Sequence, residues 1–395
     1  MKTAAVILNY NDAQGTVDAV RRIDGFFCFD SIVVVDNAST DNSAVLIKEA
    51  VDKINAEHVS VSPSSDSTAD ETASDHRGGV SSANAAAGSN EHGKGTGKYE
   101  NRIHFVASER NGGYGSGNNL GVRYAAEHCG AKLAVIANPD AEFDEELILA
   151  MQQVFEHYAN AAVVGAVMLD AASGSRDSGE FSYDEYTASG WKRRGIAGCV
   201  INGCPLLRRV FKTRINYPQE YYDVYRGVKI PSVKLRKCRK YIGIGSQVTE
   251  DAHAVIEHGS NACAAEGDAL REKTDAVEVY AVHGSLLMVS ADKFIKLGGY
   301  DEHMFLYCEE NTLAEKIYRR GLKSFLLKQG YKHAGSVSIT GSGLKAAARQ
   351  RIRNASERYY YEHYLGGGKA AMLAVNLMQS VVMLETYMAA MLHLI

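Results

Sequence analysis

The chain has 395 residues, of which 46% are hydrophobic, and a formal net charge of −4. This length suits one large α/β domain with additions, or two modest domains. The near-neutral charge argues against a dedicated nucleic-acid-binding protein, which would carry a strong basic excess. The seven cysteines include no Cys-x-x-Cys pair, so we expect neither a disulfide framework nor a cysteine zinc site, and a reducing cytoplasm fits best.

The first part of the chain alternates short apolar, β-branched runs with helical segments. Runs of this kind are typical of strands buried on both faces of a parallel sheet. The predicted strands are Ala4–Leu8, Ile32–Val35, Ile103–Val106, Leu133–Ala137 and Ala162–Val167. Helices are expected at Val17–Ile23 and over residues 42–55. The alternation predicts an α/β fold with a doubly wound, mostly parallel sheet spanning residues 1–169.

Residues 59–99 interrupt this pattern. Between Ser60 and Gly97 the chain is rich in Ser, Ala, Gly and Asp and almost lacks large apolar side chains. Such a segment cannot bury enough apolar surface to offset the entropy lost on ordering. We therefore predict a disordered insertion that carries no chemistry.

Residues 170–279 form a second interruption, which is strongly basic in its middle. Between Trp191 and Lys240 only Glu220 and Asp223 oppose a long series of Lys and Arg, and aromatic residues are interleaved. One interpretation is an ordinary solvated surface. The other is a subdomain that binds anionic lipid or a pyrophosphate-linked acceptor.

The sheet pattern resumes over residues 280–340. Strands are predicted at His283–Ser290 and Lys323–Leu327, and helices at Ala291–Leu297 and Glu309–Arg320.

Residues 341–395 read as a C-terminal helical extension. Its apolar part, Ala370–Ile395, is long enough to cross a bilayer, which takes about 20 residues. Polar and charged residues interrupt it, including Glu385. We therefore favour a helix that packs on the protein or lies in a membrane surface over one that spans the bilayer. Residues 1–8 are too short an apolar run for a signal peptide and read as a first strand.

Polar residues follow three predicted strands at the point where each strand ends. Ligands of parallel α/β sheets bind beyond the carboxyl ends of the strands. The residues concerned are Asn9, Tyr10, Asn11, Asp36, Asn37, Ser39, Asn138 and Asp140. Any one of them could be a loop cap, but three groups at one edge favour a binding site. Asp36 is suited to accept a hydrogen bond from a base N–H or a ribose hydroxyl.

A glycine-rich run, Asn111–Asn119, lies between a predicted strand and a helix. Glycine lets the backbone approach a phosphate, whose charge the helix N-terminus favours. The candidate contacts are Asn111, Gly112, Gly113, Gly117 and Asn118. The glycine spacing is not GxGxxG, and no acid follows about 20 residues on, so a dinucleotide site is disfavoured.

In combination these motifs resemble family 2 glycosyltransferases, and most of all the rhamnosyltransferase-like branch that builds bacterial surface polysaccharides. The resemblance covers residues 1–58, 100–170 and 280–340. It rests on Val6–Asn11, Val33–Asp41, Asn111–Asn119, Ala137–Asp140, His283–Ser290, Gly298–Asp301 and Phe305–Glu310. It implies a GT-A fold, a nucleoside-diphosphate sugar donor and an inverting mechanism.

The resemblance also implies roles for individual residues. Asn138-Pro139-Asp140 stands where the family has an Asp-x-Asp-like element that binds a divalent metal on the donor diphosphate, so Asp140 would bind Mg²⁺ or Mn²⁺ together with phosphates and water. His333 matches a family histidine near that metal. His283 and Gly284 match a segment that lines the acceptor side, and Asp301 would hold the acceptor-side loop or contact the acceptor.

Glu309 and Glu310 match the family's acidic pair, one member of which is the general base. Consecutive helical residues point about 100° apart, so only one of the two can face the sugar, and the matching position is Glu310. The alternative is that both acids simply complement the helix dipole.

The sequence therefore predicts transfer of a sugar from a dTDP-rhamnose-like or UDP-sugar donor to a glycan or polyprenyl-diphosphate-linked acceptor. The enzyme would be peripheral on the anionic inner face of the cell membrane and would have no nucleic-acid partner. A nucleotidyltransferase is one alternative, but Asn9–Asn11 lacks the Gly-rich, Arg-containing loop and Lys expected there. A non-catalytic binding protein is another, but it would be expected to lose Asp36, Asp140 and Glu310.

Overall fold

The computed structural model describes residues 1–60, 102–170, 189–203, 221–223, 228–230, 276–333 and 346–391. Most of the predicted insertion 59–99 lies outside these residues. Its first two positions, Val59 and Ser60, instead end a helix that began at Ser43. Much of the predicted basic insertion 170–279 also lies outside the described ranges.

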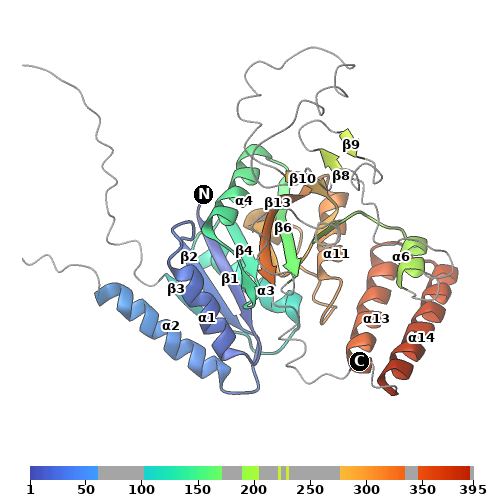
Figure 1. Cartoon of the computed structure of the whole chain (residues 1–395), viewed down its shortest axis with the longest axis horizontal. Helices are drawn as coiled ribbons and strands as arrows, with labels where there is room; N and C mark the ends of the chain where they lie inside the picture. The colour runs from blue at the N-terminus through green and yellow to red at the C-terminus, as the bar shows by residue number, and fades with distance from the viewer. Residues whose placement is uncertain are drawn as a thin grey trace, which may run out of the picture.

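One large sheet forms the centre of the molecule (Figure 1). Its strands follow the order β3-β2-β1-β4-β12-β6-β13-β10-β8-β9. Their bounds are β1 Thr3–Asn9, β2 Ser31–Asp36, β3 Ile103–Ala107, β4 Leu133–Ala137, β6 Ala161–Asp170, β8 Tyr221–Asp223, β9 Val228–Ile230, β10 Ala276–Val279, β12 Leu286–Ser290 and β13 Lys323–His333. The strands β3, β2, β1 and β4 are parallel, and β13 is parallel to β6. The strand β12 runs antiparallel between β4 and β6.

Helices cover both faces of this sheet, because alternate strand residues point to opposite sides. On one face Ile7 and Val34 pack in a cluster with α1 (Ala13–Asp24), α2 (Ser43–Ser60) and α4 (Glu145–His157). On the other face Val6 and Val33 pack with α3 (Tyr114–His128), α10 (Ala291–Lys296) and α11 (Glu309–Arg319). The predicted doubly wound α/β fold class is confirmed.

Two predicted strands have different bounds in the structure. The strand predicted from His283 begins only at Leu286, because residues 283–285 form a turn in which the Ser285 amide donates to the His283 ring. The strand predicted to end at Leu327 continues to His333 through a bulge between Leu327 and Gly330. His333 is therefore the last residue of a strand instead of a residue after it.

Two short pairings complete the architecture. The strand β5 (Ala141–Glu142) pairs with the end of β13, with His333 opposite Ala141. The strand β7 (Gly190–Trp191) pairs with β11 (Ala281–Val282), just before the 283–285 turn. The strands β8 and β9, from the predicted basic insertion, extend the sheet beyond β10.

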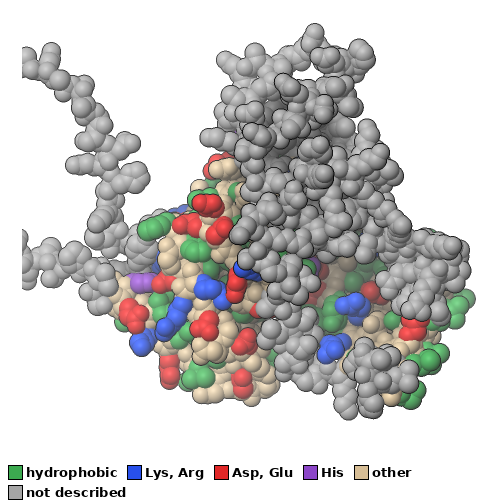
Figure 2. Space-filling view, viewed as in Figure 1, with side chains coloured by type: hydrophobic (Ala, Val, Ile, Leu, Met, Phe, Trp, Pro, Cys, Tyr) green, Lys and Arg blue, Asp and Glu red, His purple; other side chains and the backbone are tan. Residues whose placement is uncertain are grey.

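The predicted C-terminal extension is helical. The helices α13 (Ala346–His363) and α14 (Lys369–Met391) pack together, and α6 (Ile196–Gly203) packs on α14 beside the sheet (Figure 1). Among the described residues one segment, Lys369–Met388, is long and apolar enough to cross a membrane, and 17% of it is buried. Figure 2 shows hydrophobic side chains on the outer side of this helical region. The large exposed ones on α14 are Leu373, Leu377, Leu384, Tyr387, Met388 and Met391.

The glycines of α3 allow this helix to lie close to the sheet. A Cβ added to Gly121 would lie 2.4 Å from Val6 Cγ1 and 3.0 Å from Val35 Cγ2. One added to Gly117 would lie 2.4 Å from Leu8 Cδ1. Larger residues at these positions would therefore push α3 away from β1 and β2.

We predict that Gly121→Ala lowers the free energy of unfolding by about 1–3 kcal/mol, the usual cost of overpacking a core. Gly25→Ala is the matched control, because a Cβ there meets nothing within 4 Å and its φ is −73°. The control should be neutral or slightly stabilising. Denaturant unfolding followed by circular dichroism measures both, and equal stabilities would contradict the packing argument.

Candidate functional site

The residues predicted to bind a nucleoside form a buried hydrogen-bond network at the ends of β1 and β2. The Asp36 side chain is only 2% exposed. Its Oδ1 accepts from Asn9 Nδ2 at 2.7 Å and from Ser39 Oγ at 2.6 Å, and its Oδ2 accepts from the Ser39 amide at 3.0 Å. Because a carboxylate has about four acceptor positions, Asp36 mainly ties the two loops together and keeps little capacity for a ligand.

The exposed rim of this network consists of Asn11 and Thr40. Asn11 Oδ1 accepts from the Thr40 amide at 2.8 Å, and the Asn11 amide donates to Ser39 Oγ at 2.9 Å. Asn11 and Ala38 have φ angles of 55° and 54°, in the left-handed region that such residues rarely adopt. Tyr10, beside them, is half-buried. The loops are held in a fixed conformation, as a recognition surface requires.

The glycine-rich run packs against protein on several sides. Asn37 Nδ2 donates to Asn111 Oδ1 at 3.0 Å and to the Gly113 carbonyl at 3.1 Å. Gly113 has φ 90°, and a Cβ there would lie 2.0 Å from the Phe305 carbonyl oxygen. A Cβ on Gly112 would meet Ser116 Oγ at 2.6 Å. Close packing against other parts of the chain is therefore enough to explain these glycines. A bound phosphate is not needed to explain them.

Two side-chain oxygens remain without a hydrogen-bond partner in this region. Asn118 is fully buried and its Nδ2 donates to the Tyr114 carbonyl at 3.0 Å, but its Oδ1 has no partner. Asn37 Oδ1 is likewise buried without one. An unsatisfied buried acceptor costs about 1–3 kcal/mol, so these two amides are maintained at a cost to stability.

Asp140, Asn138 and His333 meet where β5 pairs with the end of β13. Asp140 Oδ1 lies 3.2 Å from His333 Nε2, and Asn138 Nδ2 lies 3.5 Å from the same ring nitrogen. The Asp140 oxygen is buried and accepts no well-aligned hydrogen bond. Within the described ranges no group of three or more His, Cys, Asp or Glu side chains is placed to hold a metal by itself. A divalent cation here would need further oxygen ligands from phosphate and water.

His283 lies beside this pair. Its ring centroid is 6.0 Å from that of His333. The Ser285 amide donates to His283 Nδ1 at 3.2 Å, so the proton of the neutral ring is on Nε2. Burial and the neighbouring His333 lower the pKa of His283 to about 4, which keeps the ring neutral at physiological pH. The sequence assigned His283 to the acceptor side, and the structure puts it next to the candidate metal residues.

Two further residues behind His283 were missed by sequence reasoning. Ser285 Oγ lies 2.9 Å from His283 Nδ1 and 2.5 Å from the Tyr331 hydroxyl. Both Ser285 and Tyr331 are almost fully buried. In the sequence Ser285 stands in the predicted strand His283–Ser290 and Tyr331 follows the predicted strand Lys323–Leu327. Nothing in either segment indicates a contact with the His283 ring.

Glu310 is placed against the same turn. A Cβ on Gly284 would lie 2.3 Å from Glu310 Oε1, so a larger residue there would displace the Glu310 carboxyl group. The Tyr114 hydroxyl donates to the Gly284 carbonyl at 2.6 Å. Burial raises the pKa of Glu310 above its ordinary value. The residues His283–Ser285 thus connect the Asp140–His333 pair with the carboxyl group of Glu310.

Glu309 is the more buried member of the acidic pair. It is 3% exposed, and its Oε1 has no hydrogen-bond partner. Burial and the negative charge of Glu310 raise the pKa of Glu309 to about 8. Glu309 is therefore mostly neutral at pH 7, and Glu310 is the member that reaches the sheet edge.

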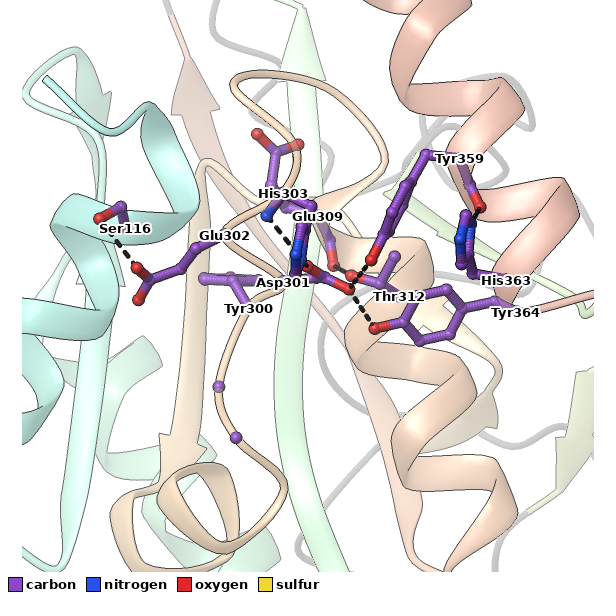
Figure 3. A network of polar contacts seen from close by, with 12 residues as sticks. Ser116, Tyr300, Asp301, Glu302, His303, Glu309, Thr312, Tyr359, His363 and Tyr364 are labelled. Atoms are coloured by element: carbon purple, nitrogen blue, oxygen red, sulfur yellow. Dashed lines mark hydrogen bonds and ion pairs between the residues drawn. The ribbon is translucent and has the colours of Figure 1, made fainter.

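Asp301 holds the loop before α11 to the C-terminal helices. Figure 3 shows its carboxylate between His303 on one side and Tyr359 and Tyr364 on the other. Asp301 Oδ2 accepts from the Tyr364 hydroxyl at 2.6 Å and from Tyr359 at 3.3 Å, and Oδ1 accepts from the His303 amide at 3.0 Å. Burial alone would raise the pKa of Asp301, but the hydrogen bonds from Tyr364 and His303 hold it at about 2. Its contacts are thus to this chain's own loop and helices.

Asn119 holds the residues on either side of Asp301 and was not among the predicted site residues. Its Oδ1 accepts from the Tyr300 amide at 2.9 Å, and its Nδ2 donates to the Tyr300 carbonyl at 3.0 Å and to Glu302 Oε1 at 2.9 Å. The loop carrying the acids is therefore fastened to α3 as well as to α13.

Comparison with known proteins finds distant glycosyltransferases and no matching family model. A segment of 54 residues is 33% identical to the low-salt glycan biosynthesis hexosyltransferase Agl10 of Haloferax volcanii; it covers 14% of this chain and only 18% of that protein. Among solved structures, GalNAc-T7 with UDP, GalNAc and Mn²⁺ has a TM-score of 0.41 at 11% identity, covering 84% of this chain and 44% of that one.

Two other solved structures are similar over most of both chains. TarS residues 1–349 from S. aureus has a TM-score of 0.40 at 10% identity and covers 93% of this chain and 74% of that one. The mannosyltransferase PcManGT from Pyrobaculum calidifontis, in complex with GDP-Man and Mn²⁺, has a TM-score of 0.42 at 12% identity and covers 95% and 73%. Glycosyltransferases thus stand among both the sequence relatives and the structural neighbours of this chain.

Because the pKa of Glu309 is raised in the folded protein, we predict that the free energy of unfolding depends on pH. Below pH 4.5 Glu309 is protonated in both the folded and the unfolded states. Between 4.5 and about 8 only the unfolded state ionises, so the free energy of unfolding falls as pH rises, by up to about 1.4 kcal/mol per pH unit. Glu309→Gln should remove this contribution, so that the melting temperature of the variant rises relative to wild type between pH 5 and pH 8.

The matched control is Glu362→Gln, which changes an exposed acid on α13. Thermal unfolding of the three proteins across this pH range provides the measurement. A constant difference between Glu309→Gln and wild type at every pH would show that Glu309 is ionised in the folded protein.

Proposed function

We propose that this protein is an inverting glycosyltransferase that uses a nucleoside-diphosphate sugar. One observation carries the proposal: the turn His283–Ser285 brings the Asp140–His333 pair and the Glu310 carboxyl group to the same edge of the sheet. A group that can hold a metal–diphosphate and a group that can accept a proton are the two elements that such a transfer needs.

Asp140 and His333 would hold the divalent metal, with Asn138 beside them. The buried Oδ1 of Asp140, which accepts no well-aligned hydrogen bond, supports this assignment, as does the His333 imidazole nitrogen 3.2 Å from it. Carboxylate and imidazole together suit Mn²⁺, and Mg²⁺ would rely more on phosphate and water oxygens. When bound, the metal neutralises negative charge on the leaving diphosphate.

The loops after β1 and β2 would recognise the nucleoside. Asn9, Asp36 and Ser39 fix the loop conformation from inside, whereas Asn11 is exposed and Tyr10 half-buried. We infer that Asp36 acts mostly through this network, using its remaining acceptor position for the base or ribose. Asn37, Asn111 and Asn118 would complete the donor side, with Gly112, Gly113 and Gly117 keeping the helix close.

Glu310 would act as the general base that removes the proton of the acceptor hydroxyl. A raised pKa brings its basicity closer to that required at neutral pH. Gly284 leaves room for the Glu310 carboxylate. Glu309, which is mostly neutral at pH 7, would help to hold the start of α11 in place. His283 stays uncharged between the metal residues and the base, where it can donate from Nε2 to the bound diphosphate.

We further propose that the acceptor carries a glycan and an anionic carrier, such as polyprenyl diphosphate. A pocket of about 480 Å³ lies alongside α11, and Trp191, Lys192, Arg193, Arg194, Tyr280, Tyr318 and Lys323 are among its lining residues. Aromatic rings suit sugars, and cations suit phosphate, although Arg193 is paired with Glu315 and Lys323 with Glu278, which also lines the pocket. The Agl10 relative is a hexosyltransferase of glycan biosynthesis, which agrees with a role in cell-surface polysaccharide synthesis.

The exposed apolar face of α14 would place the enzyme at the inner face of the membrane. At 100° per residue, positions 373, 377, 384, 388 and 391 fall within about 60° of one another, and all are exposed. Arg351 and Lys369 are exposed at the same helix pair. This combination is typical of helices that lie in an anionic interface.

The first test of the function is donor binding. UDP-, dTDP- and GDP-sugars are titrated into the protein by calorimetry with and without Mn²⁺. Binding of one donor should depend on Mn²⁺, and Asp140→Asn should weaken that binding by at least about tenfold while leaving the melting temperature close to wild type. Metal-independent binding, unchanged in Asp140→Asn, would exclude Asp140 as a metal ligand.

The second test concerns the base. Glu310→Gln keeps the shape of the side chain but cannot accept the proton, so kcat should fall by about 10²–10⁴ with donor affinity retained. Glu309→Gln should have a much smaller effect on kcat. If Glu309→Gln is the inactive variant and Glu310→Gln turns over normally, the base is Glu309.

The third test concerns the membrane. Replacing Leu373, Leu377 and Leu384 together by Ser should strongly reduce co-sedimentation with anionic vesicles, because each buried Leu contributes about 1.5–3 kcal/mol. Neutral vesicles and high salt should also weaken wild-type binding. Unchanged sedimentation of the triple variant would show that α14 does not contact the lipid.

A further inference from the structure

The acidic pair follows a turn in an unusual backbone conformation. Tyr307 and Cys308, the two residues before Glu309, have φ angles of 73° and 67°. A left-handed conformation costs a residue other than glycine about 1–3 kcal/mol, and here two occur in succession. Cys308 is the N-cap of α11 and makes no side-chain capping hydrogen bond. Within the turn, the Thr312 amide donates to the Cys308 carbonyl at 3.0 Å as the first bond of α11. Two successive left-handed residues persist only where the surrounding structure supports them as well.

The contacts that hold this turn come from α13. The Arg353 guanidinium lies 4.5 Å from the centroid of the Tyr307 ring. Ser356, which is buried, donates from Oγ to the Leu306 carbonyl at 2.7 Å. Cys308 packs in a small cluster with Tyr360 and Tyr361. Each of the residues 306–308 is thus contacted by a residue of the same helix.

The rest of the loop is anchored independently of those contacts. At its start, Asp301 accepts hydrogen bonds from Tyr359 and Tyr364 (Figure 3). In its middle, the Tyr114 amide donates to the Phe305 carbonyl at 3.1 Å. Losing one α13 contact at residues 306–308 should therefore loosen the turn without releasing the whole loop.

We propose that α13 is a positioning element of the active site, with Arg353 and Ser356 as its positioning residues. By holding Tyr307 and Cys308 in the left-handed region, they set the direction in which α11 begins and so the place of the Glu310 carboxylate against Gly284. This inference rests on the proposed role of Glu310. It gives the C-terminal extension a part in the reaction separate from any membrane contact.

The experiment uses the full chain with Ser356→Ala and Arg353→Gln. Arg358→Gln is the matched control, because it removes the same charge from an exposed position of the same helix. Two quantities are measured in each protein. The first is the rate at which N-ethylmaleimide modifies Cys308, followed by mass spectrometry of its peptide, with Cys28 and Cys129, which lie outside the cluster around Cys308, as internal references. The second is kcat and the KM for the sugar donor, with a soluble acceptor.

We expect Cys308 to be modified several-fold faster in both test variants and at the wild-type rate in Arg358→Gln. We expect kcat to fall by about tenfold or more, because a misplacement of 1 Å can cost 10² in rate, while the donor KM stays within about twofold. A general loss of folding is recognised by faster modification of the two reference cysteines.

Unchanged modification of Cys308 in a folded variant overturns the proposal, since α13 then does not hold the turn. Faster modification with unchanged kcat also overturns it, since the turn then does not position the base. A wild-type protein that transfers no sugar from any donor is a failure of the proposed function. That outcome differs from an active wild type whose test variants are equally active.

Discussion

The three residues His283–Ser285 determine where the parts of the site lie. Because β12 runs antiparallel to β4, its first residue stands beside the last residue of β4, with Leu286 opposite Ala137. The turn before β12 is therefore at the same edge of the sheet as Asn138 and Asp140. The Asn138 amide donates to the Ser285 carbonyl at 2.9 Å, which joins the two segments directly. A single antiparallel strand inserted in a parallel sheet thus brings together residues that are about 150 positions apart.

The same edge collects several features that reduce stability. Glu309 and Glu310 are adjacent carboxyl groups with raised pKa values, Asn37 and Asn118 keep unpartnered oxygens, and four residues other than glycine have left-handed φ angles. An unsatisfied buried oxygen or a left-handed residue other than glycine costs on the order of 1–3 kcal/mol. The helices and strands that carry them are buried on both sides by apolar clusters. Strain and unsatisfied groups of this kind concentrate at functional sites.

Local patterns predicted the fold class but not the tertiary contacts. The β-branched runs identified most of the parallel strands, because continuous apolar runs are what a sheet covered on both faces requires. The polar residues after the strands indicated which edge of the sheet carries the candidate site. The sequence could not indicate which atoms each of these residues contacts. Asp36 uses most of its acceptor positions for hydrogen bonds from Asn9 and Ser39. Gly113, Gly117 and Gly121 lie so close to the Phe305 carbonyl, Leu8 and Val6, respectively, that a Cβ would clash there.

The residues missed were those whose importance comes from a partner distant in sequence. Asn119 is one of several asparagines in a polar run, and only its three hydrogen bonds to Tyr300 and Glu302 set it apart. Ser356 and Arg353 stand on a helix with no motif of its own. Asp301 was expected to hold the acceptor-side loop or to contact the acceptor, and the tyrosines that bond it, Tyr359 in α13 and Tyr364 just after this helix, are about 60 positions away in the sequence.

These contacts connect the C-terminal helices with the candidate site. An appended membrane anchor would need only an apolar face, and α14 has one. The helix between it and the sheet, however, contacts the backbone immediately before the acidic pair. A force or a contact that moved α13 would therefore act on Asp301, through Tyr359, and on Tyr307 and Cys308. The physical link between the helical extension and the acidic pair is the left-handed turn, since its two strained residues directly precede Glu309 and are contacted by α13.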